Sequence, residues 1–171
     1  RVHPQARRLG VIYDPRNFSG YVQDAQKAAA ARGVRLVLKP VVEALKVRAA
    51  LEEIAGDIDA LWLLPDPQLI SADMFNFLLV FTLERKLALF GFFESFTRLG
   101  ALAAMAPDYA AIGRQAARLS QEVAAKPAET RLPLPPSLLS PGVLTINAKT
   151  ARQLGIDLPD DVQSKAKQVY R

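Results

Sequence analysis

Short apolar runs alternate with segments of helical periodicity along the first 126 residues, and this alternation limits the fold more than any other feature of the sequence. Most of the runs are continuous, as is typical of strands buried on both faces of a sheet. We expect strands at residues 9–13, 34–38, 60–64, 87–92 and 101–105. Strands that alternate with helices at this spacing have right-handed crossovers and form a mostly parallel sheet. The sequence therefore predicts an α/β fold, a doubly wound sheet in a three-layer α/β/α sandwich.

The helices between the first four strands carry recognisable end signals. The first helix is expected to begin near Ser19 and to end at Gly33, because glycine favours helix C-termini. Residues 45–55 have helical spacing as well. Ser71 can cap a third helix, which is expected to run to about Lys86.

The last helix of this part follows the fifth strand. A loop is expected at residues 94–100 before that strand, and Pro107 and Asp108 begin the helix after it. Apolar side chains recur along the helix at a spacing that places them on one stripe. The stripe consists of Tyr109, Ile112, Ala116, Leu119 and Val123.

The character of the chain changes after Lys126. Residues 130–142 contain four prolines, which favour an extended crossing segment over a regular element. The expected order after it is a strand at residues 143–147, a helix at residues 148–154 that Asn147 caps and Gly155 ends, and a polar tail. We therefore interpret residues 1–126 as the sandwich lobe and residues 127–171 as an extension of the same domain.

Composition removes several classes of function. The chain has 22 Lys and Arg against 17 Asp and Glu, but the two signs are interspersed and no groove-reading motif accompanies them. We therefore expect no nucleic-acid partner. The absence of cysteine excludes disulfides and cysteine metal sites. The apolar residues 74–83 are too few to cross a bilayer, because charged residues 84–86 follow directly.

Catalytic motifs are not found either. The single histidine, His3, precedes the first strand and is expected in solvent, and no Gly-x-Ser-x-Gly elbow occurs, so a catalytic triad cannot be assembled. Walker and Gly-x-Gly-x-x-Gly nucleotide motifs are missing. Asp14, Asp66 and Glu94 have no spacing typical of metal ligands. A phosphoacceptor receiver domain also needs a lysine after the fifth strand, where the sequence reads MAPDY. We therefore expect a protein that is not an enzyme and has no metal and no cofactor.

Polar residues follow four of the predicted strands. In an open parallel sheet, ligands bind beyond the carboxyl ends of the strands. The segments at those ends are residues 14–20, 66–71, 94–100 and 106–109, and they are rich in Asn, Ser, Asp and Glu. Each such residue alone also fits ordinary turn and cap chemistry. Their convergence on one edge predicts a binding site there.

Four motifs occur in a characteristic order: GVIYDPRN, DALWLLPDPQLIS, GALAAMAPDYAAIGRQAA and LTINAKTARQLGI. Between about Leu9 and Val162, the chain resembles the solute-binding proteins of ABC uptake transporters. The resemblance is to the branch with the type I periplasmic binding fold that is described as tryptophan or tyrosine transporters. Such proteins have two similar lobes, and this chain resembles only the second lobe and the terminal segment. It is therefore expected to be either a piece of a two-lobed protein or a single-lobed relative.

The resemblance implies a receptor that closes over a small amino-acid-like solute without chemistry. The carboxylate of such a solute would lie against helix N–H groups near Ser19 and Gly20, with help from Asn17. Its ammonium group would bind Asp66 as first choice and Glu94 as second choice. An aromatic wall is available from residues that also suit core packing, namely Phe18, Phe93, Phe96 and Tyr109.

The resemblance also implies partners and a location. A membrane permease of the ABC type would receive the solute, and the protein would be periplasmic or exported. Because the chain opens with Arg1 and not with Met, we expect an upstream segment. An alternative is the dimerising, ligand-sensing effector domain of a transcriptional regulator, which would need a helix-turn-helix before Arg1. Phenylalanines near the fourth strand also predict a homodimer through the strand-exit edge: Phe90, Phe92, Phe93 and Phe96.

Overall fold

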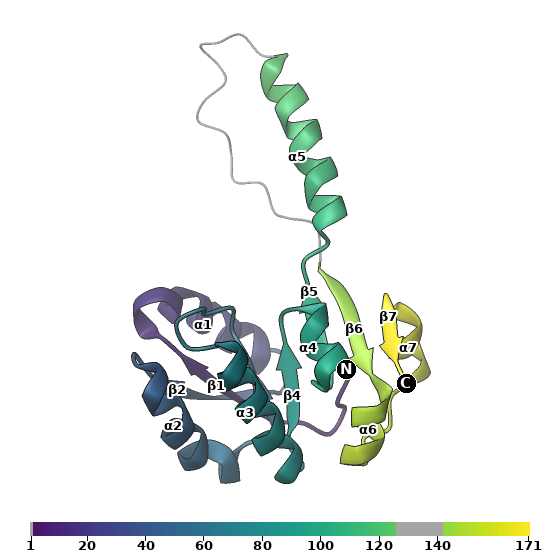
Figure 1. The fold of residues 1–171 in the computed structure, drawn as a ribbon. Coiled ribbons are helices and arrows are strands. Elements are labelled where there is room, and N and C mark those ends of the chain that lie inside the picture. Colours follow the sequence, from purple (N-terminus) through teal and green to yellow (C-terminus); the bar gives the residue numbers. More distant parts are fainter. Residues whose placement is uncertain (1, 126–141) are drawn as a thin grey trace.

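Strands and helices alternate in the computed structural model as the apolar runs predicted, and the structure describes residues 2–125 and 142–171 (Figure 1). Within these residues, one sheet has the strand order β2-β1-β3-β4-β5-β6-β7. Its strands are β1 (Arg8–Tyr13), β2 (Arg35–Pro40), β3 (Ala60–Trp62), β4 (Ala88–Gly91), β5 (Ala103–Ala106), β6 (Val143–Asn147) and β7 (Gln168–Tyr170). All neighbouring strands are parallel except β5 and β6, which are antiparallel. The α/β class and the mostly parallel sheet are therefore confirmed.

Seven α-helices and two short 3-10 helices join the strands in the described part of the chain. The α-helices are α1 (Pro15–Ala30), α2 (Val47–Ile54), α3 (Ala72–Glu84), α4 (Glu94–Leu99), α5 (Tyr109–Ala124), α6 (Ala148–Leu154) and α7 (Asp160–Lys165). The 3-10 helices are η1 (Ala44–Lys46) and η2 (Ala55–Asp57). Ser71 caps α3 by accepting a hydrogen bond from the Met74 N–H, and Asn147 caps α6 by accepting one from the Thr150 N–H, both as predicted.

Three predictions about the helices and strands are wrong: the start of the first helix, the loop at residues 94–100 and the polar tail without regular structure. The first helix begins at Pro15 and not near Ser19, because Asp14 is its N-cap and proline suits the first helical position. Residues 94–99 form α4 where a loop was expected. The polar tail contains α7 and β7, because buried Val162 ties this segment to the sheet. The predicted proline-rich crossing segment lies outside the described residues, except for its last residue, Gly142.

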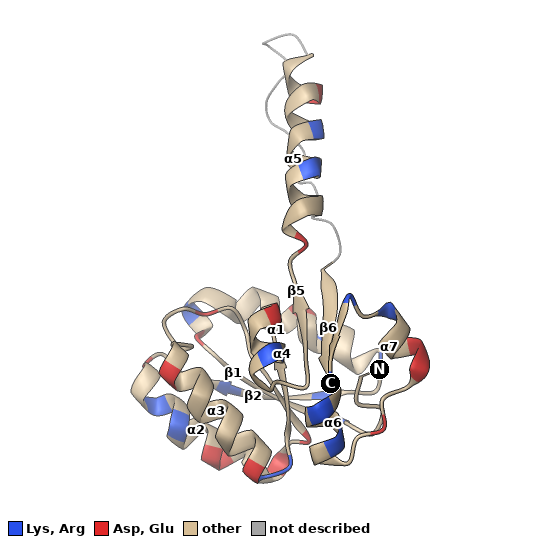
Figure 2. Cartoon of the chain, turned by 45° about the vertical axis from the view of Figure 1, so that its right-hand side comes forward, with Lys and Arg blue, Asp and Glu red and all other residues tan. Residues whose placement is uncertain are grey.

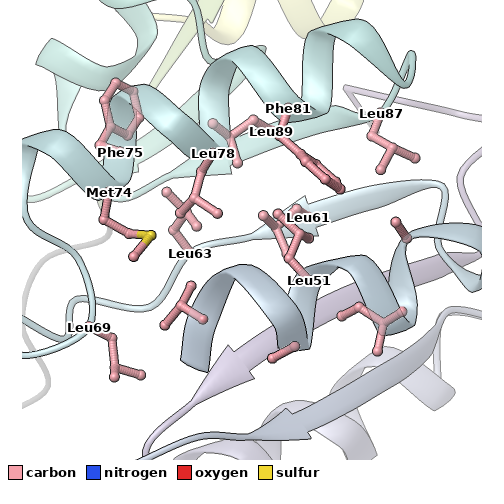
Figure 3. Close-up of a cluster of buried hydrophobic side chains, with 14 of the residues drawn as sticks. Leu51, Leu61, Leu63, Leu69, Met74, Phe75, Leu78, Phe81, Leu87 and Leu89 are labelled. Atoms are coloured by element: carbon pink, nitrogen blue, oxygen red, sulfur yellow. The ribbon is translucent and has the colours of Figure 1, made fainter. Parts of the chain in front are cut away.

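Helices cover both faces of the sheet. On one face α2 and α3 enclose the largest cluster of buried side chains, which Figure 3 shows around Leu61 and Leu89 of the central strands. On the other face, Val22 of α1 packs against Val11 of β1, and Val162 of α7 packs at the far end of the sheet. This arrangement is the three-layer sandwich that the sequence predicted.

The β5–β6 pair brings the end of the chain back into the sheet. Thr97 of α4 and Thr145 of β6 are fully buried, and their Oγ1 atoms are hydrogen-bonded at 2.8 Å. Asn147 donates from Nδ2 to the carbonyl of Thr97 at 2.9 Å. Strand β6 is thus held to α4 by buried polar contacts.

The α5 helix extends away from the sheet beyond the end of β5 (Figure 1). No residue of α5 is buried, and Tyr109 at its start is 69% exposed. The predicted apolar stripe is therefore present on a helix, but in this structure it is not part of the core.

The surface carries both signs of charge on its helices, as the interspersed sequence pattern predicted (Figure 2). Among the described residues, no helix is long and apolar enough to span a membrane.

Candidate functional site

The carboxyl ends of four neighbouring parallel strands meet at one edge of the sheet. These strands are β1, β3, β4 and β5 in spatial order. Asn17 follows β1, Asp66 follows β3, Glu94 follows β4 and Tyr109 follows β5. The topology therefore brings segments that are distant in sequence to one edge, which we name the strand-exit edge.

A pocket of about 680 Å³ opens at this edge, between the loop after β3 and the segment after β4. A volume of this size is in the range of small-molecule sites. Most of its wall is apolar, and polar groups come from Asp66, Ser71 and Asn76. The aromatic part of the wall consists of Phe75, Phe92, Phe93 and Phe96.

The aromatic wall is itself tightly packed. The rings of Phe75 and Phe96 are stacked with centroids 4.1 Å apart, and the rings of Phe92 and Phe96 meet edge to face at 5.0 Å. Phe93 is 41% exposed. A Cβ at Gly91 would lie 2.9 Å from the Phe96 ring, so glycine permits the close approach of α4 to β4. This contact fixes the position of the wall.

Asp66 is the only acidic residue among the pocket's lining residues, and it is 2% exposed. Its Oδ1 accepts a hydrogen bond from the Gln68 N–H at 2.9 Å, which holds the turn between Pro65 and Pro67. Its Oδ2 is buried and has no hydrogen-bond partner among the described residues. A buried carboxylate oxygen without a partner costs free energy of folding, so Oδ2 of Asp66 is available to accept a hydrogen bond from a ligand.

Arg16 is a charged residue of this edge that the sequence reasoning missed. Its Nη2 lies 2.6 Å from Oδ2 of the buried Asp14 and also donates to the carbonyl of Val42. The pKa of Arg16 is raised, first by its hydrogen bonds to Asp14, with a smaller contribution from the negative charge of Asp66. Its sequence signal was the Asp-Pro-Arg order at the end of β1, since aspartate at the N-cap and proline at N1 place arginine in the first turn.

The Asp14–Arg16 pair predicts a loss of stability in acid. Hydrogen bonds from the Arg16 side chain hold the pKa of Asp14 below its ordinary value, although burial opposes them. A depressed carboxyl pKa stabilises the folded state above the ordinary pKa, near 3.8, and this contribution is lost as the pH falls through the lower, folded value. We expect Asp14→Asn to weaken this acid dependence, measured by urea unfolding between neutral pH and about pH 2.5. An unchanged pH profile in the variant would contradict this role for Asp14.

The other predicted site residues do not line this pocket. Asn17, Ser19 and Gly20 are exposed and lie inside α1, and the Ser19 hydroxyl donates to the carbonyl of Pro15. The first free N–H groups of α1 are satisfied by Asp14, whose Oδ1 accepts from Arg16 and whose carbonyl accepts from Asn17. The expectation of free helix N–H groups at Ser19 and Gly20 is therefore wrong.

Glu94 and Tyr109 also lie outside the pocket. Glu94 is exposed and accepts a hydrogen bond of 2.8 Å from the Tyr170 hydroxyl, whose pKa is raised by burial and by this hydrogen bond. Tyr109 is on the projecting α5. Of the six predicted residues, the structure therefore places only Asp66 with the predicted aromatic residues Phe93 and Phe96.

Two further expectations concern His3 and the phenylalanine patch. His3 is half-buried and not in solvent, its Nδ1 has no partner among the described residues, and burial lowers its pKa. The described residues contain no group of three or more His, Cys, Asp or Glu that is suited to a metal ion. The phenylalanine patch is divided, because Phe90 lies on the α1 face of the sheet whereas Phe92, Phe93 and Phe96 line the pocket.

Comparisons with known proteins agree with this architecture. The family model described as "ABC transporter substrate binding protein" matches residues 1–170. The chain belongs to this family. A search of curated proteins finds no match.

Substrate-binding proteins are also among its structural neighbours. A conserved domain protein from Vibrio cholerae is 26% identical, with a TM-score of 0.76 over 98% of this chain. An ABC domain from Streptococcus pneumonia in complex with L-Trp is 24% identical, with a TM-score of 0.75 over 97% of this chain. A ligand-free, open substrate-binding protein with adhesive properties from Clostridium difficile is 19% identical, with a TM-score of 0.74 over 99%.

The chain spans 56% of the length of each of these three neighbours. Its fold is that of a substrate-binding lobe, with the mostly parallel sheet expected from the four sequence motifs. The resemblance drawn from those motifs is thus confirmed by the family match over nearly the whole chain.

Proposed function

We propose that this member of the substrate-binding family binds an amino-acid-like solute at the strand-exit edge and passes it to an ABC permease. Binding takes place without bond breaking, so the protein is a receptor and not an enzyme. The protein acts in the periplasm or outside the cell. These assignments rest on the family match, because importers of this class take up solutes through such receptors.

The observation that carries the proposal is the unpaired Oδ2 of buried Asp66 in a pocket with an aromatic wall. A solute ammonium group supplies both the missing hydrogen-bond donor and the opposite charge. Charge-assisted hydrogen bonds of this kind are about twice as strong as neutral ones. The ammonium group is therefore the part of the solute that Asp66 selects.

The rest of the pocket selects an apolar side chain. Phe92, Phe93 and Phe96 present ring surfaces next to Asp66, and aromatic rings attract both apolar groups and cations. Arg16 lies at the same edge outside the lining of the pocket, and its guanidinium, which is bonded to Asp14, would meet the solute carboxylate when the cleft is closed. An amino acid with a large apolar side chain matches these three features. The pneumococcal neighbour was solved with L-Trp, an amino acid of this kind.

The remaining predicted site residues lie outside the pocket, and we assign them a role only when the cleft is closed. Asn17, Ser19, Gly20 and Tyr109 are exposed at or near the strand-exit edge, and Glu94 adds negative charge there. Asn17, Ser19, Gly20 and Tyr109 would contact a solute when a second surface faces this edge, as in a homodimer through the strand-exit edge. The receptor then works because the solute is more deeply buried in the closed state than in the open state.

A ligand screen tests the proposal. We expect a large apolar L-amino acid to raise the melting temperature by about 5 °C or more at ~100 times its dissociation constant. The N-acetyl derivative of the same amino acid is the control, because acetylation removes the ammonium charge and keeps the side chain and the carboxylate. It is expected to give no shift. Equal stabilisation by both compounds, or a flat response to all amino acids, would contradict the proposal.

A further inference from the structure

The short helix α4 carries a large part of the pocket wall. Phe93 directly precedes the helix, and Phe96 and Leu99 follow at intervals of three residues. Residues at this spacing share one face of a helix, and all three line the pocket. Thr97 is fully buried and does not line the pocket. The shape of the wall therefore depends on what holds α4 in place.

The α4 helix is too short to be stable by itself. It has six residues, and isolated helices of fewer than about 12–15 residues are marginal in water. In the described structure no side chain makes a capping hydrogen bond at its N-terminus. Contacts with Phe75 and Gly91 hold the ring of Phe96. The rest of the helix depends on contacts with other elements.

The fourth sequence motif, LTINAKTARQLGI, supplies such contacts, although none of its residues lines the pocket. The hydroxyls of Thr145 and Thr97 are hydrogen-bonded at 2.8 Å. Asn147 donates from Nδ2 to the carbonyl of Thr97 at 2.9 Å. Thr150 donates from Oγ1 to the carbonyl of Gly100, also at 2.9 Å. The last carbonyls of a helix lack partners within the helix, so this motif completes the last turn of α4.

We propose that Thr145 and Asn147 are positioning residues of the pocket, which hold α4 and thereby set the size of the solute side chain that the aromatic wall accepts. This inference rests on the proposed binding of an amino-acid solute. Asp66 is held separately, by its hydrogen bond from the Gln68 N–H on the loop after β3. The wall and the carboxylate are thus fixed by different parts of the chain, and each can be altered without the other.

The hydroxyl pair is sensitive to the loss of one partner. Thr145→Val keeps nearly the same shape, but it leaves the fully buried Thr97 hydroxyl without the hydroxyl that it contacts. A buried polar group without a partner costs more free energy than the hydrogen bond contributes. In this variant α4 shifts or loosens so that the Thr97 hydroxyl regains a partner.

Amide hydrogen exchange tests the positioning without any solute. The amides of Gly100 and Ala101 both donate to the carbonyl of Phe96, so their exchange rates report on the last turn of α4. We expect Thr145→Val to raise both rates about tenfold relative to the amide of Val41, which donates to β1 far from α4 along the sheet.

Thr82→Val is the matched control for Thr145→Val. Thr82 is also fully buried, but its hydroxyl donates to carbonyls of its own helix, α3. We expect its substitution to leave the Gly100 and Ala101 rates within threefold of wild type. Equal acceleration of the Gly100, Ala101 and Val41 amides in Thr145→Val would show a general loss of stability and would overturn the positioning role.

Solute selectivity tests the consequence for binding. The probes are the tightest-binding large apolar L-amino acid of the ligand screen, its N-acetyl derivative and L-alanine. We expect Thr145→Val and Asn147→Ser to lower the preference for the large amino acid over L-alanine about tenfold. Serine at position 147 can still cap α6, but it has no amide group to donate to Thr97. The preference for the free amine over the N-acetyl derivative is expected to stay within threefold, because Asp66 is unchanged.

Thr145→Ser keeps the hydroxyl and is expected to retain both preferences within threefold of wild type. An unchanged size preference in Thr145→Val and Asn147→Ser, or an equal loss of the amine preference, would overturn the positioning role. A wild-type protein that binds none of the amino acids would contradict the proposed function itself. The exchange rates at Gly100 and Ala101 would then still decide whether β6 holds α4 in place.

Discussion

Asp66→Asn is expected to weaken binding of the amino-acid solute about 100-fold, which corresponds to ~2.7 kcal/mol. Asparagine keeps an oxygen that can accept from the Gln68 N–H, so the turn is retained. It removes the negative charge at the buried position where Oδ2 has no partner. Titration calorimetry measures the loss. The variant is also expected to lose the preference for a free amine over its N-acetyl derivative.

Glu94→Gln is the matched control for Asp66→Asn. Both substitutions remove one carboxylate from the same edge, but Glu94 is exposed, bonded to Tyr170 and outside the pocket. We expect the affinity of Glu94→Gln to remain within about threefold of wild type, because exposed charges are screened by water and salt. Equal losses in the two variants would mean that the overall charge of the edge, and not Asp66, attracts the solute.

Leu61→Ala is expected to lower the free energy of unfolding by about 3 kcal/mol. Leu61 is 1% exposed and lies on β3 between α2 and α3, in the middle of the largest buried cluster (Figure 3). Removal of its side chain leaves a cavity that the surrounding strands and helices cannot fill. Urea unfolding followed by circular dichroism measures the change.

The control for Leu61→Ala is the same substitution at a solvent-exposed position. Leu45 on η1 is 91% exposed, so Leu45→Ala is expected to change the free energy of unfolding by less than about 0.5 kcal/mol. A similar loss at both positions would show that burial in this cluster is not the source of stability.

The sequence predicted the elements whose signals are local. Asn147 and Gly155 bracket α6 at the predicted residues, because the cap and the left-handed residue act within one or two turns. The start of α1 was missed, although Asp14 and Pro15 are favoured residues for it, because the same residues are common in turns. The short α4 was missed because six residues contain too little periodicity to distinguish a helix from a loop.

Only part of the site could be predicted from the sequence, because some of its contacts join residues that are far apart in the chain. Asp66 follows directly from the end of a buried strand, so topology alone placed it at the edge. Glu94 was assigned to the same role by the same rule, but its hydrogen bond with Tyr170 joins residues 76 positions apart in the sequence. No local pattern contains such a contact. It appears only when the last strand is added to the sheet.

The pairing of β5 with β6 has a mechanical consequence. The chain leaves the sheet at Ala106 and enters it again at Val143, and these two residues are register partners. A Cβ at the neighbouring Gly142 would lie 2.8 Å from the Ala106 carbonyl oxygen, so the backbone segments at Ala106 and Gly142 are in close contact. Any body attached to α5 is therefore joined to this lobe through two adjacent backbone segments. Such a connection bends easily in one direction and resists twisting, so it acts as a hinge with one preferred axis of rotation.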